Sequence, residues 1–383
     1  MKIPEGIQLD LSGQRFSVDY SIFCLTEKEA MSRAREVCVE ETVEFPEKLI
    51  PEGDIKNNIV GKVEHIQKVN DGHYLASISF AVETSSNDLV QLLNILYGNI
   101  SMAPGIRVES VTLPDALLKR FNGPRFGMNG IRELLGVRER PILSTAIKPM
   151  GLSPVRLGEM AYEMAIGGID IIKDDHGLAN QSFCPFEERI DRVTEAIAKA
   201  NHETGRKSLY LPNITAPTDL ILKRAQYAKK TGADGFLLIS SLVGWDTMRW
   251  LADIDELQLP IMCHPAFYGI YYQSKKMGFS AKAIYGQIPR LAGADAVIFP
   301  NYIGRFPSTK ADCLSVIHSA TQPMGKILPT FPCPGGGLTL DRFPEYKDVY
   351  GKDVIYLMGG GLHHGESLVD TCRQFRKMVE NIR

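Results

Sequence analysis

Apolar residues in about the first 115 positions recur at two spacings, one typical of strands and one typical of helices. Alternating apolar and polar positions, the pattern of half-buried strands, occupy residues 15–25, 59–69, 73–82 and 106–113. Helical patterns occupy residues 26–39 and 86–96, and Thr26 with Glu29 has the spacing of a capping box. The order of one strand, one helix, two strands, one helix and one strand predicts a ferredoxin-like α+β domain.

From Pro141 onward, short apolar strands alternate with amphipathic helices, which is the pattern of a parallel sheet. Eight strands are expected, at residues 142–147, 169–172, 208–211, 235–239, 260–263, 296–299, 327–331 and 354–357. Eight such units in roughly 240 residues fit a closed (β/α)8 TIM barrel, with an open doubly wound sheet as the alternative. Polar or glycine-rich residues follow nearly every strand, which favours the barrel, because there they meet at one face. We therefore expect two domains, residues 1–120 and 121–383.

The composition narrows the class of protein. The chain is 44% hydrophobic and 23% charged, with a net charge of −2, so nothing in it attracts nucleic acid or an anionic membrane. Its seven cysteines form no C-x-x-C pair, as expected of reduced thiols in the cytosol. No signal peptide is visible, and no apolar run approaches the ~20 residues that span a bilayer. These features predict a cytoplasmic protein.

Ionisable residues follow the first two expected barrel strands. Lys148 follows the first strand, where burial can lower the pKa of a lysine and make it a base, although a surface lysine is an equal alternative. Lys173, Asp174, Asp175 and His176 follow the second strand. Four such groups beside an apolar strand are costly unless they are paired, and a divalent metal is the natural partner of carboxylates and imidazole. The alternative is an ordinary loop with an aspartate as the helix cap.

Two glycine triplets, residues 335–337 and 359–361, follow the last two expected strands. Glycine lets backbone N–H groups close around an anion, and these two loops are the usual phosphate site of such barrels. The triplets therefore predict a phosphate site, with a pair of tight turns as the alternative. His264, after the fifth strand, is a candidate acid or base because imidazole titrates near neutral pH. His264 and Asn213, which ends the third strand, can equally be structural loop residues.

Several motifs occur together in one order along the chain. IKP (147–149), GLSP (151–154), GGIDIIKDDH (167–176), the histidine after strand five, a Gly-Arg loop and both glycine triplets resemble the RuBisCO large-chain superfamily. The segments CVEET (38–42) and YGNI (97–100) resemble parts that reach a neighbouring subunit's active site in that family. The resemblance covers nearly the whole chain and implies a RuBisCO-like protein.

The resemblance also implies roles for individual residues. Lys148 matches the lysine that handles substrate protons, Lys173 matches the lysine whose carbamate, formed with CO2, binds Mg2+, and Asp175 matches a metal ligand. Arg305 lies where carboxylases carry a mobile-loop lysine. Four glycines match phosphate-binding positions of the family: Gly336, Gly337, Gly359 and Gly360. Two further residues, Glu40 and Asn99, match residues that are contributed across a homodimer interface.

Departures from the family pattern affect the expected function. His176 replaces a glutamate metal ligand, which leaves the choice between Mg2+ and Mn2+ open. Pro265, Ile298 and Gly335 replace an arginine, a histidine and a serine that serve a second phosphate. Because a dianion needs such partners, we expect a monophosphate as substrate. Arg305 in place of the lysine argues against CO2 fixation.

The main hypothesis is metal-dependent enolate chemistry, by decarboxylation, C–C cleavage or enolisation, on a phosphorylated keto sugar acid in carbohydrate catabolism. In it Lys148 moves a proton, His264 is a second acid or base, and Arg305 anchors a carboxylate. One alternative is a methionine-salvage enolase or isomerase acting on a methylthio-ketopentose 1-phosphate, with an apolar pocket of Phe267, Tyr268 and Ile298. The other is a sugar-phosphate-binding protein without catalysis.

Overall fold

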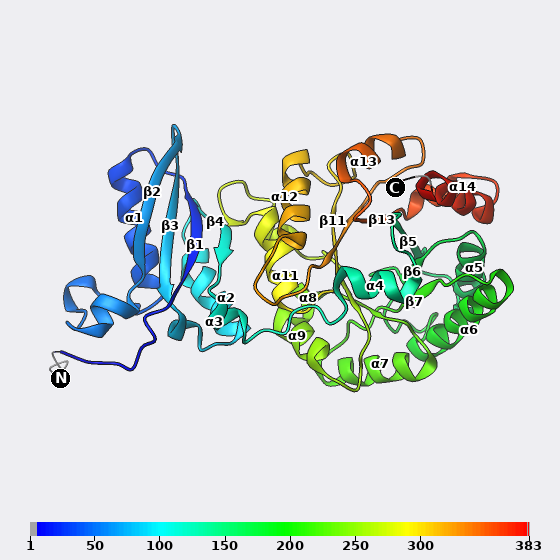
Figure 1. The fold of residues 1–383 in the computed structure, drawn as a ribbon, viewed down its shortest axis with the longest axis horizontal. Coiled ribbons are helices and arrows are strands. Elements are labelled where there is room, and N and C mark those ends of the chain that lie inside the picture. The colour runs from blue at the N-terminus through cyan, green and yellow to red at the C-terminus, as the bar shows by residue number, and fades with distance from the viewer. Residues whose placement is uncertain (1–5, 381, 383) are drawn as a thin grey trace. The chain divides into compact units, whose positions relative to one another are not determined.

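The computed structural model describes residues 6–380 and residue 382. The chain forms two compact units (Figure 1). Unit 1 consists of the described residues of Met1–Phe121, Tyr268–Gln287 and Met324–Lys326, and unit 2 of those of Asn122–Phe267, Ile288–Pro323 and Ile327–Arg383. None of the helices in the described part of the chain is both long and apolar enough to cross a membrane.

Unit 1 is built on a five-stranded sheet with the order β10-β4-β1-β3-β2. The strands are β1 (Arg15–Ile22), β2 (Lys62–Asn70), β3 (His73–Ala81), β4 (Ile106–Thr112) and β10 (Gly278–Phe279). The first four pair antiparallel in the ferredoxin-like order, as the sequence pattern predicts. Strand β10 pairs parallel with β4 and was not predicted, because two residues carry no periodicity.

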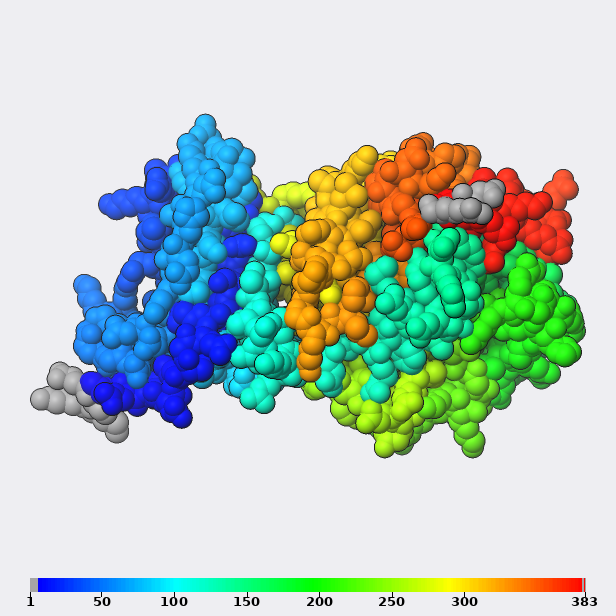
Figure 2. Space-filling view, in the orientation of Figure 1, coloured from blue at the N-terminus to red at the C-terminus, as the bar shows by residue number. Residues whose placement is uncertain are grey.

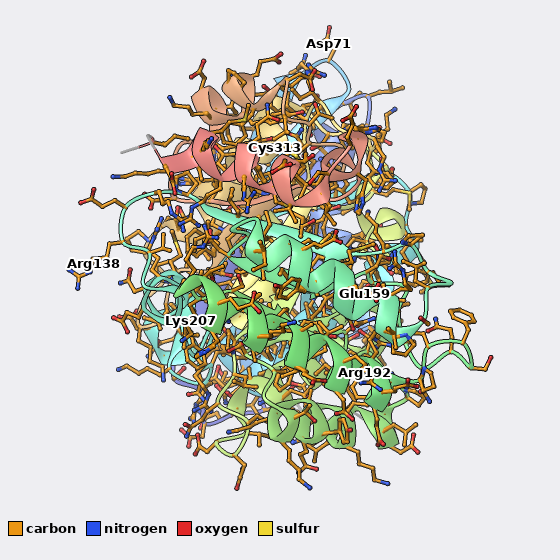
Figure 3. All side chains as sticks on the ribbon, turned by 90° about the vertical axis from the view of Figure 1, so that its right-hand side faces the viewer. Asp71, Arg138, Glu159, Arg192, Lys207 and Cys313 are labelled. Atoms are coloured by element: carbon orange, nitrogen blue, oxygen red, sulfur yellow. The ribbon has the colours of Figure 1, made fainter. Side chains whose placement is uncertain are left out.

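Alternation along the strands of unit 1 separates a buried face from a polar one. In β1, Phe16, Val18 and Tyr20 are fully buried, whereas the residues between them are partly exposed. The helices of this unit are α1 (Glu27–Glu40), α2 (Leu89–Tyr97), α3 (Asp115–Leu118) and α10 (Gly269–Tyr272). The tip of the β2–β3 hairpin projects from the unit, where the side chain of Asp71 is 99% exposed (Figures 2 and 3).

The helices α1 and α2 begin at side-chain caps. Thr26 accepts the N–H of Glu29 at 3.2 Å, which is one half of the predicted capping box, whereas the Glu29 carboxylate accepts the N–H of Leu25 at 3.1 Å in place of that of Thr26. Asp88 accepts the N–H of Gln91 at 2.7 Å and sets the start of α2 at residue 89, later than the predicted residue 86. The predicted start fails because Ser86 and Asn87 have positive φ angles, 51° and 55°, which no helix accommodates.

Unit 2 contains eight parallel strands, which confirms the predicted (β/α)8 barrel. Four form the order β13-β5-β6-β7 and four the order β12-β11-β9-β8, and β12 packs against β13. Leu237 of β8 joins the two sheets, because its N–H donates to Pro212 O at 2.8 Å and its carbonyl accepts from Ile214 N at 3.1 Å. The strands are β5 (Ile142–Ile147), β6 (Ile171–Asp174), β7 (Leu209–Leu211), β8 (Phe236–Leu238), β9 (Ile261–Cys263), β11 (Ala296–Pro300), β12 (Phe331–Gly335) and β13 (Ile355–Leu357).

Two strands lie further along the chain than predicted. Strand β12 spans Phe331–Gly335 and not residues 327–331, because Pro332, Pro334 and Gly335 are residues that a sequence pattern excludes from a strand. Strand β6 spans Ile171–Asp174 and not residues 169–172. Lys173 and Asp174 are therefore part of the barrel wall itself.

Apolar side chains fill the barrel, and helices surround it. The inner cluster includes Ile171, Leu211, Met262, Ile298 and Phe331, all at most 5% exposed. Charged side chains such as Glu159 and Arg192 cover the outer helices (Figure 3). The helices are α4 (Gly127–Leu135), α5 (Pro154–Ile166), α6 (Phe186–Thr204), α7 (Thr218–Thr231), α8 (Ser240–Val243), α9 (Trp245–Asp253), α11 (Ile288–Leu291), α12 (Lys310–Thr321), α13 (Phe343–Tyr350) and α14 (Leu368–Glu380).

Candidate active site

Lys173 is a buried amine near the carboxyl end of β6. It is 2% exposed, and its Nζ donates to the carbonyl of Asp174 at 3.0 Å. Burial lowers the pKa of Lys173 from 10.5 to about 8, while the negative charge of Asp175 opposes that change. A substantial fraction of the amine is therefore neutral at slightly alkaline pH, which is the form that reacts with electrophiles or binds a metal.

Asp175 and His176 follow Lys173 and converge on each other. His176 Nδ1 lies 3.2 Å from Asp175 Oδ1, which also accepts the N–H of Gly177 at 3.1 Å. The other oxygen, Asp175 Oδ2, lies 4.0 Å from Lys148 Nζ. The Asp175 carboxylate thus lies between the Lys148 amine and the His176 imidazole, at the carboxyl ends of the barrel strands, where the candidate residues were predicted to meet.

His176 stacks on His264, which follows β9. Their ring centroids are 4.3 Å apart and the planes differ by 11°. Burial lowers the pKa of both imidazoles, and the cations Lys173 and Lys148 lower it further. The N–H of Ala266 donates to His264 Nδ1 at 3.1 Å, so the proton of the neutral ring lies on Nε2. His264 therefore offers an N–H donor.

Lys148 lies against the glycine loop that follows β13. A Cβ atom built on Gly359 would be 2.9 Å from Lys148 Nζ, so the lysine occupies the space that a larger residue at position 359 would fill. A Cβ built on Gly360 would meet no atom within 4 Å. The loop thus presents an open backbone position directly beside the lysine amine.

The second glycine triplet holds the loop that carries Arg305. Gly336 O accepts the N–H of Arg305 at 2.9 Å, and Gly335 O accepts the N–H of Asn301 at 2.9 Å. A Cβ on Gly337, whose φ is +108°, would lie 3.0 Å from Arg305 N. Gly337 is therefore required for the close approach of the two loops. The Arg305 charge also contributes to lowering the pKa of His176.

Large apolar side chains are exposed in several loops at the carboxyl end of the barrel. Met150, Leu242, Phe267 and Phe306 follow four different strands and are each 50–55% exposed. Met150 lies next to the loop of Asp175, since its Cε would be 2.8 Å from a Cβ on Gly177. Of the residues predicted to form an apolar pocket, Phe267 is in this group. Ile298 is buried inside the barrel, and Tyr268 is buried in unit 1.

Glu40 and Asn99 lie in unit 1 and form a pair of their own. Asn99 Nδ2 donates to Glu40 Oε1 at 3.1 Å. Their predicted role across a dimer interface stays a prediction.

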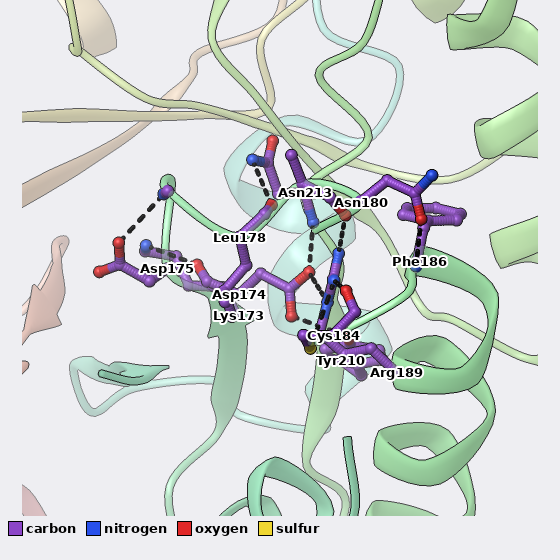
Figure 4. A network of polar contacts seen from close by, with 12 residues as sticks. Lys173, Asp174, Asp175, Leu178, Asn180, Cys184, Phe186, Arg189, Tyr210 and Asn213 are labelled. Atoms are coloured by element: carbon purple, nitrogen blue, oxygen red, sulfur yellow. Dashed lines mark hydrogen bonds and ion pairs between the residues drawn. The ribbon is translucent and has the colours of Figure 1, made fainter. Parts of the chain in front are cut away.

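The sequence did not indicate the hydrogen-bond network behind β6. Asp174 points away from the barrel interior and pairs with Arg189 of α6, with Nε to Oδ2 at 3.0 Å (Figure 4). Both side chains are fully buried. A sequence signal did exist, because Arg189 lies on the apolar face of α6 that Phe186, Ile190 and Val193 define.

Within residues 6–380 and 382, no three side chains of His, Cys, Asp and Glu gather to hold a metal ion. Asp175 and His176 supply two such groups, and Lys173 lies two residues before Asp175 on β6. Two ligands bound at about 2.1 Å and at right angles lie about 3 Å apart. The 3.2 Å between Asp175 Oδ1 and His176 Nδ1 fits that geometry. With a neutral or carbamylated Lys173 as the third ligand, the donor set suits a divalent cation.

The chain is similar to proteins of one family over most of its length. The family model of the ribulose bisphosphate carboxylase large chain, catalytic domain, matches residues 127–380. A ribulose bisphosphate carboxylase-like protein of Archaeoglobus fulgidus is 38% identical over 316 residues, covering 82% of this chain and 72% of that protein. The crystal structure of a Rubisco-like protein from Rhodopseudomonas palustris has a TM-score of 0.87 at 35% identity and covers 96% of this chain and 99% of that one.

Two relatives carry the names of specific enzymes. A 5-methylthioribulose-1-phosphate isomerase of Rhodospirillum rubrum is 36% identical over 333 residues, covering 86% of this chain and 87% of that protein. A 2,3-diketo-5-methylthiopentyl-1-phosphate enolase of Geobacillus kaustophilus is 32% identical over 310 residues, covering 80% of this chain and 75% of that protein. Both names describe the rearrangement of a phosphorylated five-carbon chain that carries a methylthio group.

Proposed function

The chain belongs to the ribulose bisphosphate carboxylase large-chain family and is an enzyme of the lyase or isomerase type, and from this premise we propose that it enolises or isomerises a methylthio-ketopentose 1-phosphate. The observation that carries the proposal is the cluster of Lys148, Lys173, Asp175 and the stacked pair His176–His264 at the carboxyl end of the barrel. This cluster combines a proton carrier, an anionic ligand and a neutral N–H donor beside two glycine loops.

The proposed reaction needs a proton to leave a carbon next to a carbonyl group. Lys148 accepts that proton, and the electron pair of the C–H bond moves to the carbonyl oxygen. His264 Nε2–H donates a hydrogen bond to the oxygen as its charge grows. A divalent ion bound by Asp175, His176 and a carbamylated Lys173 would supply a Lewis acid that polarises the same carbonyl. An isomerisation is completed when the hydroxyl on the deprotonated carbon gives its proton to that oxygen and becomes the new carbonyl, while the carbon proton returns to the neighbouring carbon; returning the proton to oxygen alone completes an enolisation.

The loops after β12 and β13 are proposed to hold the phosphate. Gly359 lies beside the amine of Lys148, and a Cβ on the next residue, Gly360, would meet no atom within 4 Å. Backbone N–H groups of glycine loops bind phosphate without a side chain in the way. A single phosphate at this end fits a substrate whose other end is uncharged.

The exposed apolar residues of the barrel loops favour the methylthio substrate over a sugar acid. Met150 lies beside the loop of Asp175, and Phe306 lies beside Gly336. A thioether is apolar and polarisable, and it packs well against methionine and aromatic side chains. The isomerase and the enolase named above carry the names of methylthio-ketopentose phosphates, and neither name describes a sugar acid. They support the methionine-salvage alternative better than the carbohydrate-catabolism hypothesis.

Proton exchange into the substrate is the direct test. Purified protein with Mg2+ or Mn2+ and bicarbonate is incubated in D2O with 5-methylthioribulose 1-phosphate or 2,3-diketo-5-methylthiopentyl 1-phosphate, and the carbon-bound protons are followed by NMR. We expect deuterium uptake or conversion of one compound. Lys148→Ala should reduce it by about 10²- to 10⁴-fold, the usual contribution of a positioned acid or base.

Lys207→Ala is the matched control, because Lys207 is an exposed lysine that precedes β7 at the opposite end of the strands. It should leave the rate unchanged. Conversion of a keto sugar acid monophosphate with no reaction of either methylthio compound would select the earlier hypothesis. No exchange in any of these compounds would favour a binding protein.

A further inference from the structure

We infer that Arg189 and Asn213 are positioning residues for the metal ligands: they fix the loop of residues 175–184 through its backbone and thereby present Asp175 and His176 to one ion. The inference rests on the proposed function, because it assumes that these two side chains bind a metal. Neither residue needs to touch the ion or the substrate. Figure 4 shows the network that connects them.

Asp174 is the centre of this network and is completely buried. Its carboxylate accepts three hydrogen bonds, from Arg189 Nε at 3.0 Å, from Tyr210 OH at 2.8 Å and from the backbone N–H of Asn213 at 3.0 Å. These partners come from α6, β7 and the loop after β7, so one carboxylate joins two successive βα units, β6–α6 and β7–α7. Because side chains alternate along a strand, the same geometry turns the neighbouring Lys173 toward the barrel interior.

Arg189 ties the middle and the far end of the loop to Asp174. Its Nη2 donates to Ala179 O at 2.9 Å, and its Nη1 donates to Cys184 O at 3.3 Å. The guanidinium also lies 5.5 Å from the ring centre of Phe186. All three nitrogens are thus used, which a lysine with one nitrogen cannot reproduce.

Asn213 holds the start of the loop. Its Nδ2 donates to His176 O at 3.0 Å and to Leu178 O at 2.9 Å, while its Oδ1 accepts from Thr215 N at 3.2 Å. Together with Arg189, it binds the carbonyls of residues 176, 178, 179 and 184. The backbone at His176 is therefore fixed by hydrogen bonds to the carbonyls of residues 176 and 178.

The target of these hydrogen bonds distinguishes positioning from packing. A buried ion pair is weak evidence for stability, since an apolar group of similar volume can fill the same space. Here the hydrogen bonds of Arg189 to Ala179 O, Cys184 O and Cys184 Sγ all end on the loop that carries the ligands. Arg290 is equally buried, but it binds only the carbonyls of other segments, at residues 319, 322, 327 and 328. It provides a matched control.

The test measures Mn2+ affinity by EPR and calorimetry in the full chain with bicarbonate. Arg189→Lys and Asn213→Ala should weaken Mn2+ binding by about 10- to 100-fold, as loss of an outer-shell partner of a metal site does. At saturating Mn2+, the kcat of these variants should lie closer to the wild-type value than their Mn2+ affinity does. Arg290→Lys should lower the melting temperature similarly without changing Mn2+ affinity. If Arg189→Lys does not fold, Asn213→Ala and the milder Tyr210→Phe decide the question.

The outcomes separate this inference from the proposed function. Unchanged Mn2+ affinity in the folded Arg189 and Asn213 variants would overturn the positioning role alone. A similar loss of affinity in Arg290→Lys would also overturn it, since a general loss of stability would then explain the effect. A wild-type protein that binds no Mn2+ would overturn the metal-dependent function and this inference with it.

Discussion

At the scale of single residues, the charge of the site depends on which amines carry a proton. Lys148, Lys173 and Arg305 all act on the imidazole of His176, while Asp175 is the anion within contact of it. Asp174 does not add to that charge, because Arg189 pairs with it on the other side of β6. The unmodified site is therefore cationic, and carbamylation of Lys173 would replace a positive charge by a negative one and create a metal ligand.

The pH dependence of activation follows from the pKa of Lys173, which burial lowers to about 8. Below that pH the amine is mostly protonated and does not react with CO2, and above it the neutral amine does. We expect activation by bicarbonate and metal to rise from pH 7 to pH 9 with a midpoint near pH 8. Activity after preincubation at each pH, assayed at one common pH, measures this. Activation that stays constant over this range, or that survives in Lys173→Ala, would contradict carbamylation.

The metal preference depends on His176. A neutral imidazole suits Mn2+ or Co2+ better than Mg2+, which prefers oxygen ligands. His176→Glu should therefore raise Mg2+ affinity relative to Mn2+ affinity by about tenfold or more, as calorimetry with each ion would show. His318→Glu makes the same charge change on the exposed surface of α12 and should leave the ratio unchanged. An unaltered ratio in His176→Glu would mean that residue 176 is not a ligand.

Several residues of the candidate site were predictable because they lie at strand ends. Lys148, Lys173, Asp175 and His176 follow or end β5 and β6, and adjacent parallel strands bring them together. The stacking of His176 on His264 was not predictable, since it joins β6 and β9 through side-chain orientation that no spacing encodes. Arg189 was overlooked because arginine is rarely buried, although its position on the apolar face of α6 indicates burial.

At the scale of elements, the loop after β13 sets the place of Lys148. A methyl group at Gly359 would meet Lys148 Nζ at 2.9 Å and Cε at 3.2 Å, whereas one at Gly360 would meet nothing. Gly359→Ala should displace the flexible lysine and lower kcat by about tenfold or more while the melting temperature changes little, since a single surface substitution rarely costs more than about 0.5 kcal/mol. Gly360→Ala is the matched control for the backbone effect of the same change.

Steady-state kinetics and thermal unfolding of both variants check this prediction. Equal activity of Gly359→Ala and the wild type would show that Lys148 does not act from the position seen here. A loss in both variants would instead indicate that any side chain in this loop interferes with phosphate binding.

Element boundaries show where sequence patterns stop being informative. The eight barrel strands were all expected in number and order, and five of them begin or end at the predicted residue. Strand β12 begins four residues after its predicted start. Sequence patterns exclude prolines from strands, and Pro332 and Pro334 lie in this one. Strand β10 was missed because only its pairing with β4 defines it.

At the scale of the whole molecule, the candidate residues divide between the two units. Unit 2 holds all the groups proposed to touch the substrate or the metal, and unit 1 holds Glu40 and Asn99. The resemblance assigns these two residues to the active site of a neighbouring subunit. If that is right, each active site of a homodimer needs unit 2 from one chain and unit 1 from the other.

Mixed dimers test this division directly. Lys173→Ala and Asn99→Ala are each expected to abolish most activity as homodimers. In a heterodimer, one active site contains both substitutions. The other combines the intact unit 2 of the Asn99→Ala chain with the intact unit 1 of the Lys173→Ala chain, and this site regains activity. Co-expression of differently tagged chains with random pairing makes half of the dimers mixed, each with one intact site, and about a quarter of wild-type activity should return. Purification through both tags should raise that value to about half. Absence of any recovery in doubly tagged dimers would place Asn99 in the site of its own chain or outside the site altogether.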